Sequence, residues 1–288
     1  MQYQVLTMDI DGTLRPFGAS AIPQDTFAAI RAVQRAGTRV VIATGRGRVS
    51  VPNALLGGLR PDAWLCAAGG EVLDGAGRLV AAHRLNEQEM YALVDFFEDY
   101  DYPLRFQFSD GNYAYVGYAE SLARQKAHPS GIVLIDGEDQ TRHLQDMPYS
   151  AFGRLPQQAA DRFQQKYGYL GLRFLFHNAT DCDIMPAGVD KGSALAELLA
   201  HWQIPTAACV AVGDSDNDAG MLRTAGLGGC VADGTPPAGG AADRTCPPAA
   251  ECGVAQLCRE LWPEAFAEAG AWRPGIPGLG AACRRCRE

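Results

Sequence analysis

The sequence lacks the features of a membrane or secreted protein. None of its apolar runs approaches the roughly 20 residues that a membrane-spanning helix needs. The stretch before Asp9 contains no basic residue and no long apolar run, so it does not have the pattern of a signal peptide. We therefore expect a soluble, cytoplasmic protein that has no membrane partner.

Positive charge is also scarce. The chain has 25 Lys and Arg residues against 33 Asp and Glu residues, which gives a formal net charge of -8 at pH 7. Binding to nucleic acid depends on clustered Lys and Arg that neutralise phosphates, so we expect no nucleic-acid partner. An anionic substrate would need local cations or a metal ion. The 288 residues, of which 47% are hydrophobic, suffice for one or two globular domains.

The nine cysteines do not have the even count of a secreted disulfide framework. Cys66 and Cys209 lie within apolar runs, where cysteine behaves as a small hydrophobic residue, and we expect both to be buried and reduced. Cys283 and Cys286 form a CxxC near the C-terminus, which on its own is a weak signal for zinc or redox chemistry. We expect no zinc there.

Strand and helix patterns alternate in the first part of the chain. An apolar run at 4–8 predicts a buried strand, residues 24–37 have helical spacing, and the β-branched run at 39–43 predicts a second strand. This order implies a right-handed crossover and a parallel sheet. The polar clusters at 9–13 and 44–47 follow the two strands, so we expect them at the carboxyl edge of the sheet, where ligands bind.

The middle of the chain is rich in Tyr and Phe and has a different pattern. Residues 89–100 are helix-like, whereas 104–117 and 170–185 alternate as strands do, which predicts a separate α+β module. Strand and helix alternation then resumes with a helix at 191–202 and a strand at 207–212. We assign residues 1–80 and 187–262 to one α/β core, 81–186 to an inserted α+β domain, and 263–288 to a flexible C-terminal tail.

The first polar cluster contains two carboxylates, Asp9 and Asp11, which point the same way in an extended backbone. Such a pair suits phosphoryl transfer through a covalent aspartyl-phosphate: one carboxylate attacks phosphorus, and the other protonates the leaving oxygen and later activates water. Two carboxylates repel a phosphate, so a lysine and a divalent cation are needed. Mg²⁺ accepts carboxylate and carbonyl oxygens, and Asp214 is the expected third ligand.

Each cluster taken alone also has a simpler interpretation. Residues 9–13 are compatible with an ordinary turn at the end of a strand. Residues 214–218 are similar to the start of an EF-hand loop, but Ala219 replaces the glycine of its sharp turn. Residues 44–47 suggest a dinucleotide site, but Ser50 occupies the position of its third glycine. The joint occurrence of the clusters favours the catalytic interpretation.

Together the clusters resemble the four motifs of the haloacid dehalogenase (HAD) superfamily of phosphatases, at residues 9–13, 43–46, 191–192 and 213–218. Residues 183–192 and the position of the insert more narrowly resemble the Cof-type branch of this superfamily. The resemblance extends over about residues 3–262. It implies an α/β fold, with a Rossmann-like parallel-sheet core and an inserted α+β cap domain.

The resemblance also implies a role for each motif residue. Asp9 is the implied nucleophile and Asp11 the general acid and base, with Thr44 and Lys191 also catalytic. The residues implied to bind the phosphoryl group are Ile10, Thr44, Gly45, Lys191 and Asn217. The implied Mg²⁺ ligands are Asp9, Asp11 through its backbone carbonyl, and Asp214, while Asp218 is expected to orient Lys191 or a metal-bound water.

The predicted activity is that of a Mg²⁺-dependent phosphatase that hydrolyses a small phosphorylated metabolite. Sugar phosphates, nucleotides such as flavin mononucleotide, and pyridoxal phosphate all remain open as substrates. Two alternatives also remain: a phosphomutase that acts on sugar phosphates, and a non-catalytic regulator that binds a phosphorylated ligand. The sequence does not indicate the oligomeric state.

Several side chains of the insert and its neighbourhood are expected to be structural. Aromatic residues such as Phe108 and Tyr115 are assigned to the core of the insert, because buried aromatics dominate core packing. Arg105 and Arg173 are assigned to surface ion pairs in preference to a contact with a second anionic group. Arg46 is expected either to reach substrate or to form a salt bridge at the domain surface.

Overall fold

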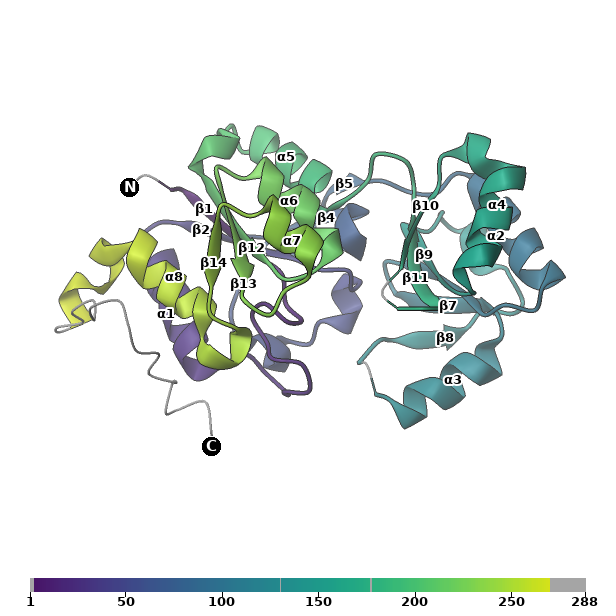
Figure 1. Ribbon diagram of the computed structural model, residues 1–288, viewed down its shortest axis with the longest axis horizontal. Coiled ribbons are helices and arrows are strands. Elements are labelled where there is room, and N and C mark those ends of the chain that lie inside the picture. The colour runs from purple at the N-terminus through teal and green to yellow at the C-terminus, as the bar shows by residue number, and fades with distance from the viewer. Residues whose placement is uncertain (1–2, 130, 177, 270–288) are drawn as a thin grey trace.

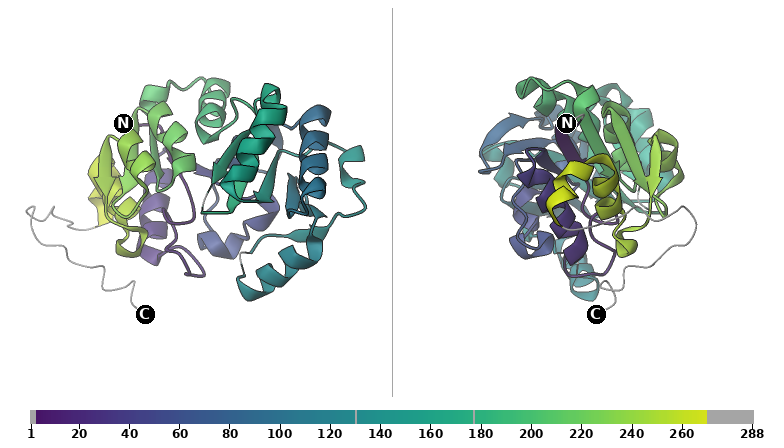
Figure 2. Two further views of the ribbon diagram at one scale, coloured as in Figure 1. Left: turned by 45° about the vertical axis from the view of Figure 1, so that its right-hand side comes forward. Right: turned by 90° about the vertical axis from the view of Figure 1, so that its left-hand side faces the viewer.

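The computed structural model describes residues 3–129, 131–176 and 178–269. It contains two sheets, one of eight strands in the order β14-β13-β12-β1-β2-β3-β4-β5 and one of six in the order β10-β11-β9-β6-β7-β8. Figure 1 and the left view of Figure 2 show the blue and teal part of the chain, the cap, beside a core. The purple beginning and the green to yellow end of the described chain build that core. The predicted α/β fold with an inserted second sheet is confirmed.

The core sheet is parallel except at one edge. The strands at its centre are apolar over their whole length because helices cover both faces, and every residue of β1 is buried. The parallel strands are β1 (Val5–Met8), β2 (Arg39–Ala43), β3 (Ala63–Cys66), β12 (Cys209–Gly213), β13 (Leu227–Val231) and β14 (Arg244–Cys246). The antiparallel edge consists of β4 (Glu71–Asp74) and β5 (Leu79–Ala82).

Alternate residues of the central strands pack against different helices. Leu6 and Met8 lie in one hydrophobic cluster with α1 (Gln24–Arg35) and α8 (Gly253–Leu261). Val5 lies in another cluster on the opposite face, whose helices are α5 (Lys191–His201), α6 (Ala219–Thr224) and α7 (Pro236–Ala241). The short 3-10 helices of the core are η1 (Arg48–Ser50), η2 (Asn53–Leu56), η3 (Ala67–Gly69), η6 (Thr206–Ala208), η7 (Asp216–Asp218), η8 (Ala249–Glu251) and η9 (Pro263–Ala269).

The cap is a sheet covered on one face by helices. Its strands are β6 (Leu104–Phe108), β7 (Gly111–Val116), β8 (Leu134–Asp136), β9 (Ser150–Arg154), β10 (Arg173–Phe176) and β11 (Asp181–Met185). Its helices are α2 (Glu87–Asp99), α3 (Tyr118–Ala127) and α4 (Gln157–Tyr167), with short 3-10 helices η4 (Arg142–Leu144) and η5 (Gly168–Leu170). Figure 1 shows α2 and α4 on the side of the cap sheet away from the core.

The alternation of β6 determines which cap residues face the core. Leu104, Phe106 and Phe108 are buried in the same hydrophobic cluster as residues of α2 and α4. Since successive side chains of a strand point to opposite faces, Arg105 and Gln107 lie on the open face of the cap sheet. This face borders the cavity that the cap forms with the core.

Several structural predictions are confirmed. Cys66 and Cys209 are free and buried, and the predicted core aromatics Phe108 and Tyr115 are buried in the cap. None of the helices in the described parts of the chain is long and apolar enough to cross a membrane. Cys283 and Cys286 lie outside the described residues.

The predicted tail is partly structured. Its first residues, 263–269, form η9, and Ala265 and Phe266 of this segment pack against the core cluster that contains α1 and α8. The sequence did not indicate this contact, because the few large apolar residues of the segment lie among Pro, Glu and Ala. We retain the boundaries at 80, 186 and 262 as proposed limits of the domains.

Candidate active site

The carboxyl ends of three neighbouring strands build the candidate site. Strand β1 pairs with β2 on one side and with β12 on the other, both in parallel, so the residues that follow these strands meet at one edge of the sheet. They line a cavity of about 490 Å³ between core and cap. The sequence-predicted residues that line it are Asp9, Asp11, Thr44, Gly45, Asp214 and Asn217.

Lys191 reaches the floor of this site from the first turn of α5. Asp190 fixes the start of that helix, because its carboxylate accepts hydrogen bonds from the backbone N–H groups of Gly192 and Ser193, each at 2.8 Å. The Nζ of Lys191 donates to Oδ1 of Asp9 at 2.6 Å and to Oδ1 of Asp218 at 2.7 Å. Burial lowers the pKa of Lys191, but the two carboxylates outweigh burial and hold it above its ordinary value. The buried lysine is therefore charged at neutral pH.

Asp218 organises the turn that follows β12. Its Oδ2 accepts hydrogen bonds from the backbone N–H groups of Asp214 and Ser215, both at 3.0 Å, while its Oδ1 contacts Lys191. The side chain is completely buried. Both oxygens are thus engaged by the protein, and one of them contacts Lys191, which Asp218 was expected to orient.

Asp214 is held from the opposite side by the loop after β1. The hydroxyl of Thr13 donates to its Oδ1 at 2.7 Å. Gly12 has a φ of +94°, and a Cβ at this position would lie 2.4 Å from Oδ2 of Asp214. Burial raises the pKa of Asp214 to about 6, although the Thr13 hydrogen bond lowers it. Burial also raises the pKa of Asp9, and the charge of Lys191 offsets this only in part.

These carboxylates fit a divalent cation. One oxygen each of Asp9, Asp214 and Asp218 lies within 4.8 Å of the others, and oxygen donors are the ligands that Mg²⁺ prefers. Among the described residues, no donor contacts Oδ2 of Asp9 or Oδ2 of Asp214, whereas both oxygens of Asp218 accept hydrogen bonds. The donor set therefore favours Asp9 and Asp214 as cation ligands.

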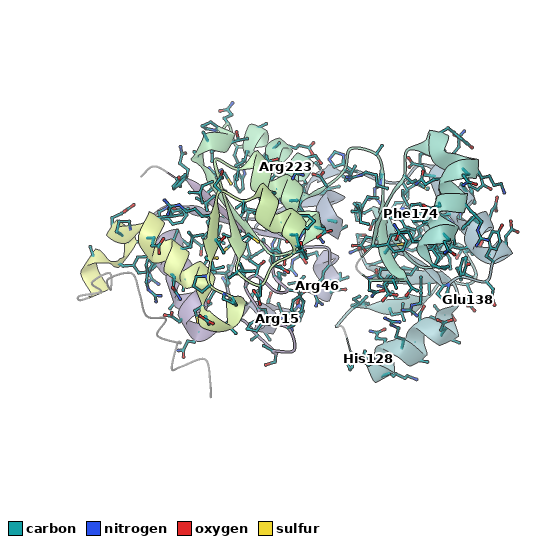
Figure 3. The ribbon with its side chains drawn as sticks, viewed as in Figure 1. Arg15, Arg46, His128, Glu138, Phe174 and Arg223 are labelled. Carbon is teal, nitrogen blue, oxygen red and sulfur yellow. The ribbon has the colours of Figure 1, made fainter. Side chains whose placement is uncertain are left out.

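The side chain of Asp11 is held by two arginines. Its Oδ1 accepts a hydrogen bond from Nε of Arg15 at 2.9 Å and its Oδ2 from Nε of Arg46 at 2.6 Å. Burial raises the pKa of Asp11, but the two arginines outweigh burial and hold it below its ordinary value. Of the two roles expected for Arg46, the structure shows the salt bridge. Figure 3 labels Arg46 on the side of the core that faces the cap, with Arg15 near it.

The loop after β2 and the turn after β12 offer polar groups to an anion. Thr44 is buried, and its hydroxyl oxygen accepts a hydrogen bond from the backbone N–H of Arg46 at 3.1 Å, so its own O–H is able to donate. Ser215 donates to the side-chain oxygen of Asn217, which leaves the amide nitrogen as a donor. Ile10 is completely buried in the core, so only its backbone is placed to contact a phosphoryl group.

The cap lies close over this loop. A Cβ at Gly45 would be 3.9 Å from Oδ2 of Asp183 in the cap and 4.0 Å from Nδ2 of Asn217 in the core. A cap-to-core hydrogen bond runs from the backbone N–H of Val133 to the hydroxyl of Ser50 at 3.1 Å. The cavity is therefore lined by residues of both parts.

The expectation of a surface ion pair is wrong for Arg105. This residue lines the cavity, and its guanidinium lies 3.7 Å from the ring centre of Phe152. Its side chain forms no ion pair with any of the described residues. Its position on β6, alternating with core residues, directs it to the open face of the cap sheet. Arg173 does form the expected ion pair, with Nη1 3.8 Å from Oδ2 of Asp190.

Sequence reasoning also missed other residues of the cavity. On the cap side these are Gln107, Asn112, Ile132, Phe152 and Asp183. The alternation of the cap strands was a usable signal for which residues share a face, but it did not show which face borders the core. The pairing of Arg15 with Asp11, four positions apart in a turn, had no sequence signal because both residues are also common on surfaces.

A family model of haloacid dehalogenase-like hydrolases matches residues 6–257. The chain belongs to this family. The HMP-PP phosphatase of Escherichia coli strain 55989 is 25% identical over 253 residues, which cover 81% of this chain and 85% of that protein. Phosphatase YwpJ of Bacillus subtilis is 24% identical over 290 residues, which cover 90% of this chain and 99% of that protein.

Solved structures of HAD phosphatases share the fold. The phosphatase BT1666 of Bacteroides thetaiotaomicron superposes with a TM-score of 0.79 at 20% identity, covering 90% of this chain and 94% of its own. The subclass IIB sugar phosphatase BT4131 superposes with a TM-score of 0.75 at 19% identity, covering 90% of this chain and 98% of its own. The resemblance to capped HAD phosphatases stated from the motifs is thus confirmed.

Proposed function

We propose that this HAD-family hydrolase is a Mg²⁺-dependent phosphatase that acts on a small phosphorylated metabolite through an aspartyl-phosphate at Asp9. The observation that carries the proposal is the buried contact between Lys191 and Asp9. Asp214 lies close to Asp9, and both carboxylates line the cavity between core and cap. A lysine between two carboxylates orients the nucleophile and supplies positive charge for an incoming phosphoryl group.

The first step is an attack of one Asp9 oxygen on phosphorus. The other oxygen of the carboxylate is held by Lys191, which fixes its orientation. As the bond from phosphorus to the leaving oxygen breaks, Asp11 supplies a proton to that oxygen. A Mg²⁺ ion held by Asp9, Asp214 and the backbone carbonyl of Asp11 would neutralise the charge of the carboxylates and of the phosphoryl oxygens.

The second step returns the enzyme to its starting state. Asp11, now a carboxylate, takes a proton from a water that attacks phosphorus, and the bond between phosphorus and Asp9 breaks. Thr44, the N–H of Gly45 and Asn217 hold phosphoryl oxygens during both steps in this proposal, which their position in the lining of the cavity supports. Arg46 contacts Asp11 and lines the cavity, so an arriving phosphate competes with Asp11 for this guanidinium. Loss of the contact with Arg46 raises the pKa of Asp11 and favours the protonated form that the first step requires.

The cavity and the relatives support a small substrate. A volume of about 490 Å³ lies within the range of small-molecule sites. The similar proteins named above include an HMP-PP phosphatase and a sugar phosphatase, which supports phosphorylated metabolites as the class. Within this class, sugar phosphates, nucleotides and pyridoxal phosphate all remain candidates.

The proposal is tested with a panel of phosphorylated metabolites and an aryl phosphate. We expect phosphate release with Mg²⁺ and none after chelation. Asp9→Asn removes the nucleophile, so we expect turnover to fall by about a thousandfold or more while the fold is kept. The matched control is Asp95→Asn, an exposed position on α2, which should keep full activity.

Three other results would contradict the proposal. Turnover retained by Asp9→Asn would exclude this nucleophile. Phosphoryl exchange between sugar isomers that is faster than phosphate release would indicate a phosphomutase. Tight metabolite binding without turnover in Mg²⁺ would indicate a regulator.

A further inference from the structure

Arg105 is a partly buried cation whose hydrogen-bonding groups have no partner in the described structure. Its Nε is buried and has no partner, and within the described residues its guanidinium makes no hydrogen bond or ion pair. Removing a charged group from water is unfavourable unless an opposite charge or a set of hydrogen bonds compensates it. A hydrogen-bond acceptor beside the Arg105 guanidinium would therefore be favourable, and the described residues do not supply one.

The neighbouring charges do not supply this acceptor. Arg124 and Arg154 share one carboxylate, that of Asp181, at 2.6 Å and 2.8 Å respectively. Burial lowers the pKa of Arg105 to about 10, and the negative charge of Asp183 offsets burial only in part. Arg105 therefore keeps its charge at neutral pH, and no carboxylate in the described structure accepts a hydrogen bond from its N–H groups.

The contact with Phe152 determines which part of the Arg105 guanidinium is available to a ligand. The two residues are opposite each other on β6 and β9, and the guanidinium lies 3.7 Å from the centre of the Phe152 ring. Stacking uses the flat face of a guanidinium and leaves its N–H edge available for an in-plane, bidentate acceptor such as a carboxylate or a phosphate. Phe152 thus holds the group rigid without occupying its donors.

Arg105 faces the same cavity as the proposed nucleophile. Two arginines line this cavity in the described structure: Arg46, which contacts Asp11 on the core side, and Arg105 on the cap side. The remaining cap residues that line it include the amides Gln107 and Asn112. Arg105 is therefore the cation that the cap presents to a substrate in this cavity.

We propose that Arg105 binds a second anionic group, carried by the leaving group of the substrate, while Asp9 attacks the phosphoryl group at the core side of the cavity. This inference rests on the proposed phosphatase function and narrows its substrate class. The substrates are phosphate esters or anhydrides whose leaving group itself carries a carboxylate or a further phosphate.

The test uses pairs of phosphate esters that differ in a second anion. Glycerol 3-phosphate is paired with 3-phosphoglycerate, and fructose 6-phosphate is paired with fructose 1,6-bisphosphate. We expect kcat/KM to be about 10-fold or more higher for the doubly anionic member of at least one pair, since hydrogen bonds between charged groups are the strong ones. A preference in the first pair identifies a carboxylate, and a preference in the second identifies a phosphate.

Variants then assign this preference to Arg105. Arg105→Gln should lower kcat/KM for the doubly anionic member about 10-fold more than for its partner, and Arg105→Lys should recover part of the difference. Arg162→Gln is the matched control, because Arg162 is exposed on α4, on the other face of the cap sheet. It should leave the preference unchanged.

A binding measurement separates this inference from the proposed function. Asp9→Asn protein, titrated calorimetrically with the same four compounds, should bind the doubly anionic members more tightly, and Arg105→Gln in this background should remove the difference. If the wild type hydrolyses no phosphate ester, the proposed function fails, but the binding preference is still measured. Equal binding within both pairs, no binding of any of the four, or an equal loss for both members in Arg105→Gln would overturn the role of Arg105.

Discussion

The Nζ of Lys191 lies 2.6 Å from Oδ1 of Asp9, although the two residues are 182 positions apart in the chain. One comes from the start of α5 and the other from the end of β1, and each is buried. Because a buried charge is strongly destabilising without its partner, this contact links the stability of the core to the chemistry of the site.

Replacement of this lysine tests the link. Lys191→Met leaves Asp9 and Asp218 buried without their cation, so we expect the free energy of unfolding at pH 7 to fall by about 3 kcal/mol or more. Urea unfolding followed by circular dichroism measures the change. Lys166→Met, at an exposed position of α4, should change it by less than about 0.5 kcal/mol. Equal stabilities of the two variants would show that the buried lysine does not hold the carboxylates together.

Substitution of two glycines in the loop after β1 tests the position of Asp214. Gly12 and Gly18 both have positive φ, +94° and +82°, so alanine is strained at either position. A Cβ at Gly12 would also meet Oδ2 of Asp214 at 2.4 Å, whereas a Cβ at Gly18 meets no atom within 4 Å. We expect Gly12→Ala to reduce phosphate release by about tenfold or more, because it displaces a proposed cation ligand, and Gly18→Ala to keep it. Similar activities of the two variants would contradict this placement of Asp214.

Mg²⁺ binding to the carboxylates is measured without turnover. An ion that binds only the folded state raises its stability, by about 2.7 kcal/mol at a hundredfold excess over the dissociation constant. We expect the thermal midpoint of the wild type to rise with added Mg²⁺, and to rise much less in Asp214→Asn. Asp95→Asn should respond as the wild type does. An unchanged response in Asp214→Asn would remove this residue from the cation site.

The cap contains a carboxylate whose ionisation stabilises the fold. Burial raises the pKa of Asp181, but hydrogen bonds from Arg154 and Asn178 and the charges of Arg154 and Arg124 outweigh burial and hold it below its ordinary value. The stabilisation is therefore present above the unfolded-state pKa of about 3.9 and is lost as the pH falls through the lower folded-state value.

Asp181→Asn should accordingly be less stable than the wild type at pH 7, by about 1 to 3 kcal/mol. The difference should shrink as the pH falls below about 4. Urea unfolding between pH 7 and pH 3 measures this, with Asp161→Asn, exposed on α4, as the control that shows no such dependence. A difference that is constant with pH would mean that the Asp181 charge does not contribute.

The parallel core sheet, and the position of the motifs at one edge of it, were predictable because both follow from short patterns in the sequence. Apolar β-branched runs such as 39–43 form buried strands, and the polar residues that follow parallel strands must meet at one edge. The residues of the four motifs lie at such positions or at the start of α5. Their contacts, such as the engagement of both Asp218 oxygens, depend on turn geometry that the sequence does not display.

The remaining features depend on contacts between distant segments. Helix α7 (Pro236–Ala241) contains two prolines and two glycines, a composition that does not favour a helix, and it packs in the cluster under α5 and α6. The position of Arg105 in the cavity follows from the way the cap sheet faces the core, which alternation within one strand does not reveal. The two arginines on Asp11 likewise come together only when the loops after β1 and β2 are adjacent.

The central claim is that Asp9 carries the phosphoryl group between the two steps. Asp11→Asn should slow hydrolysis of the intermediate, because asparagine cannot accept the proton of the attacking water. The protein is mixed with an aryl phosphate and Mg²⁺, quenched in acid and digested for mass spectrometry. The account predicts phosphate on the peptide that contains Asp9, and none in Asp9→Asn. Turnover by the wild type with phosphate on another residue, or with none on Asp9 in the Asp11→Asn protein, would contradict it.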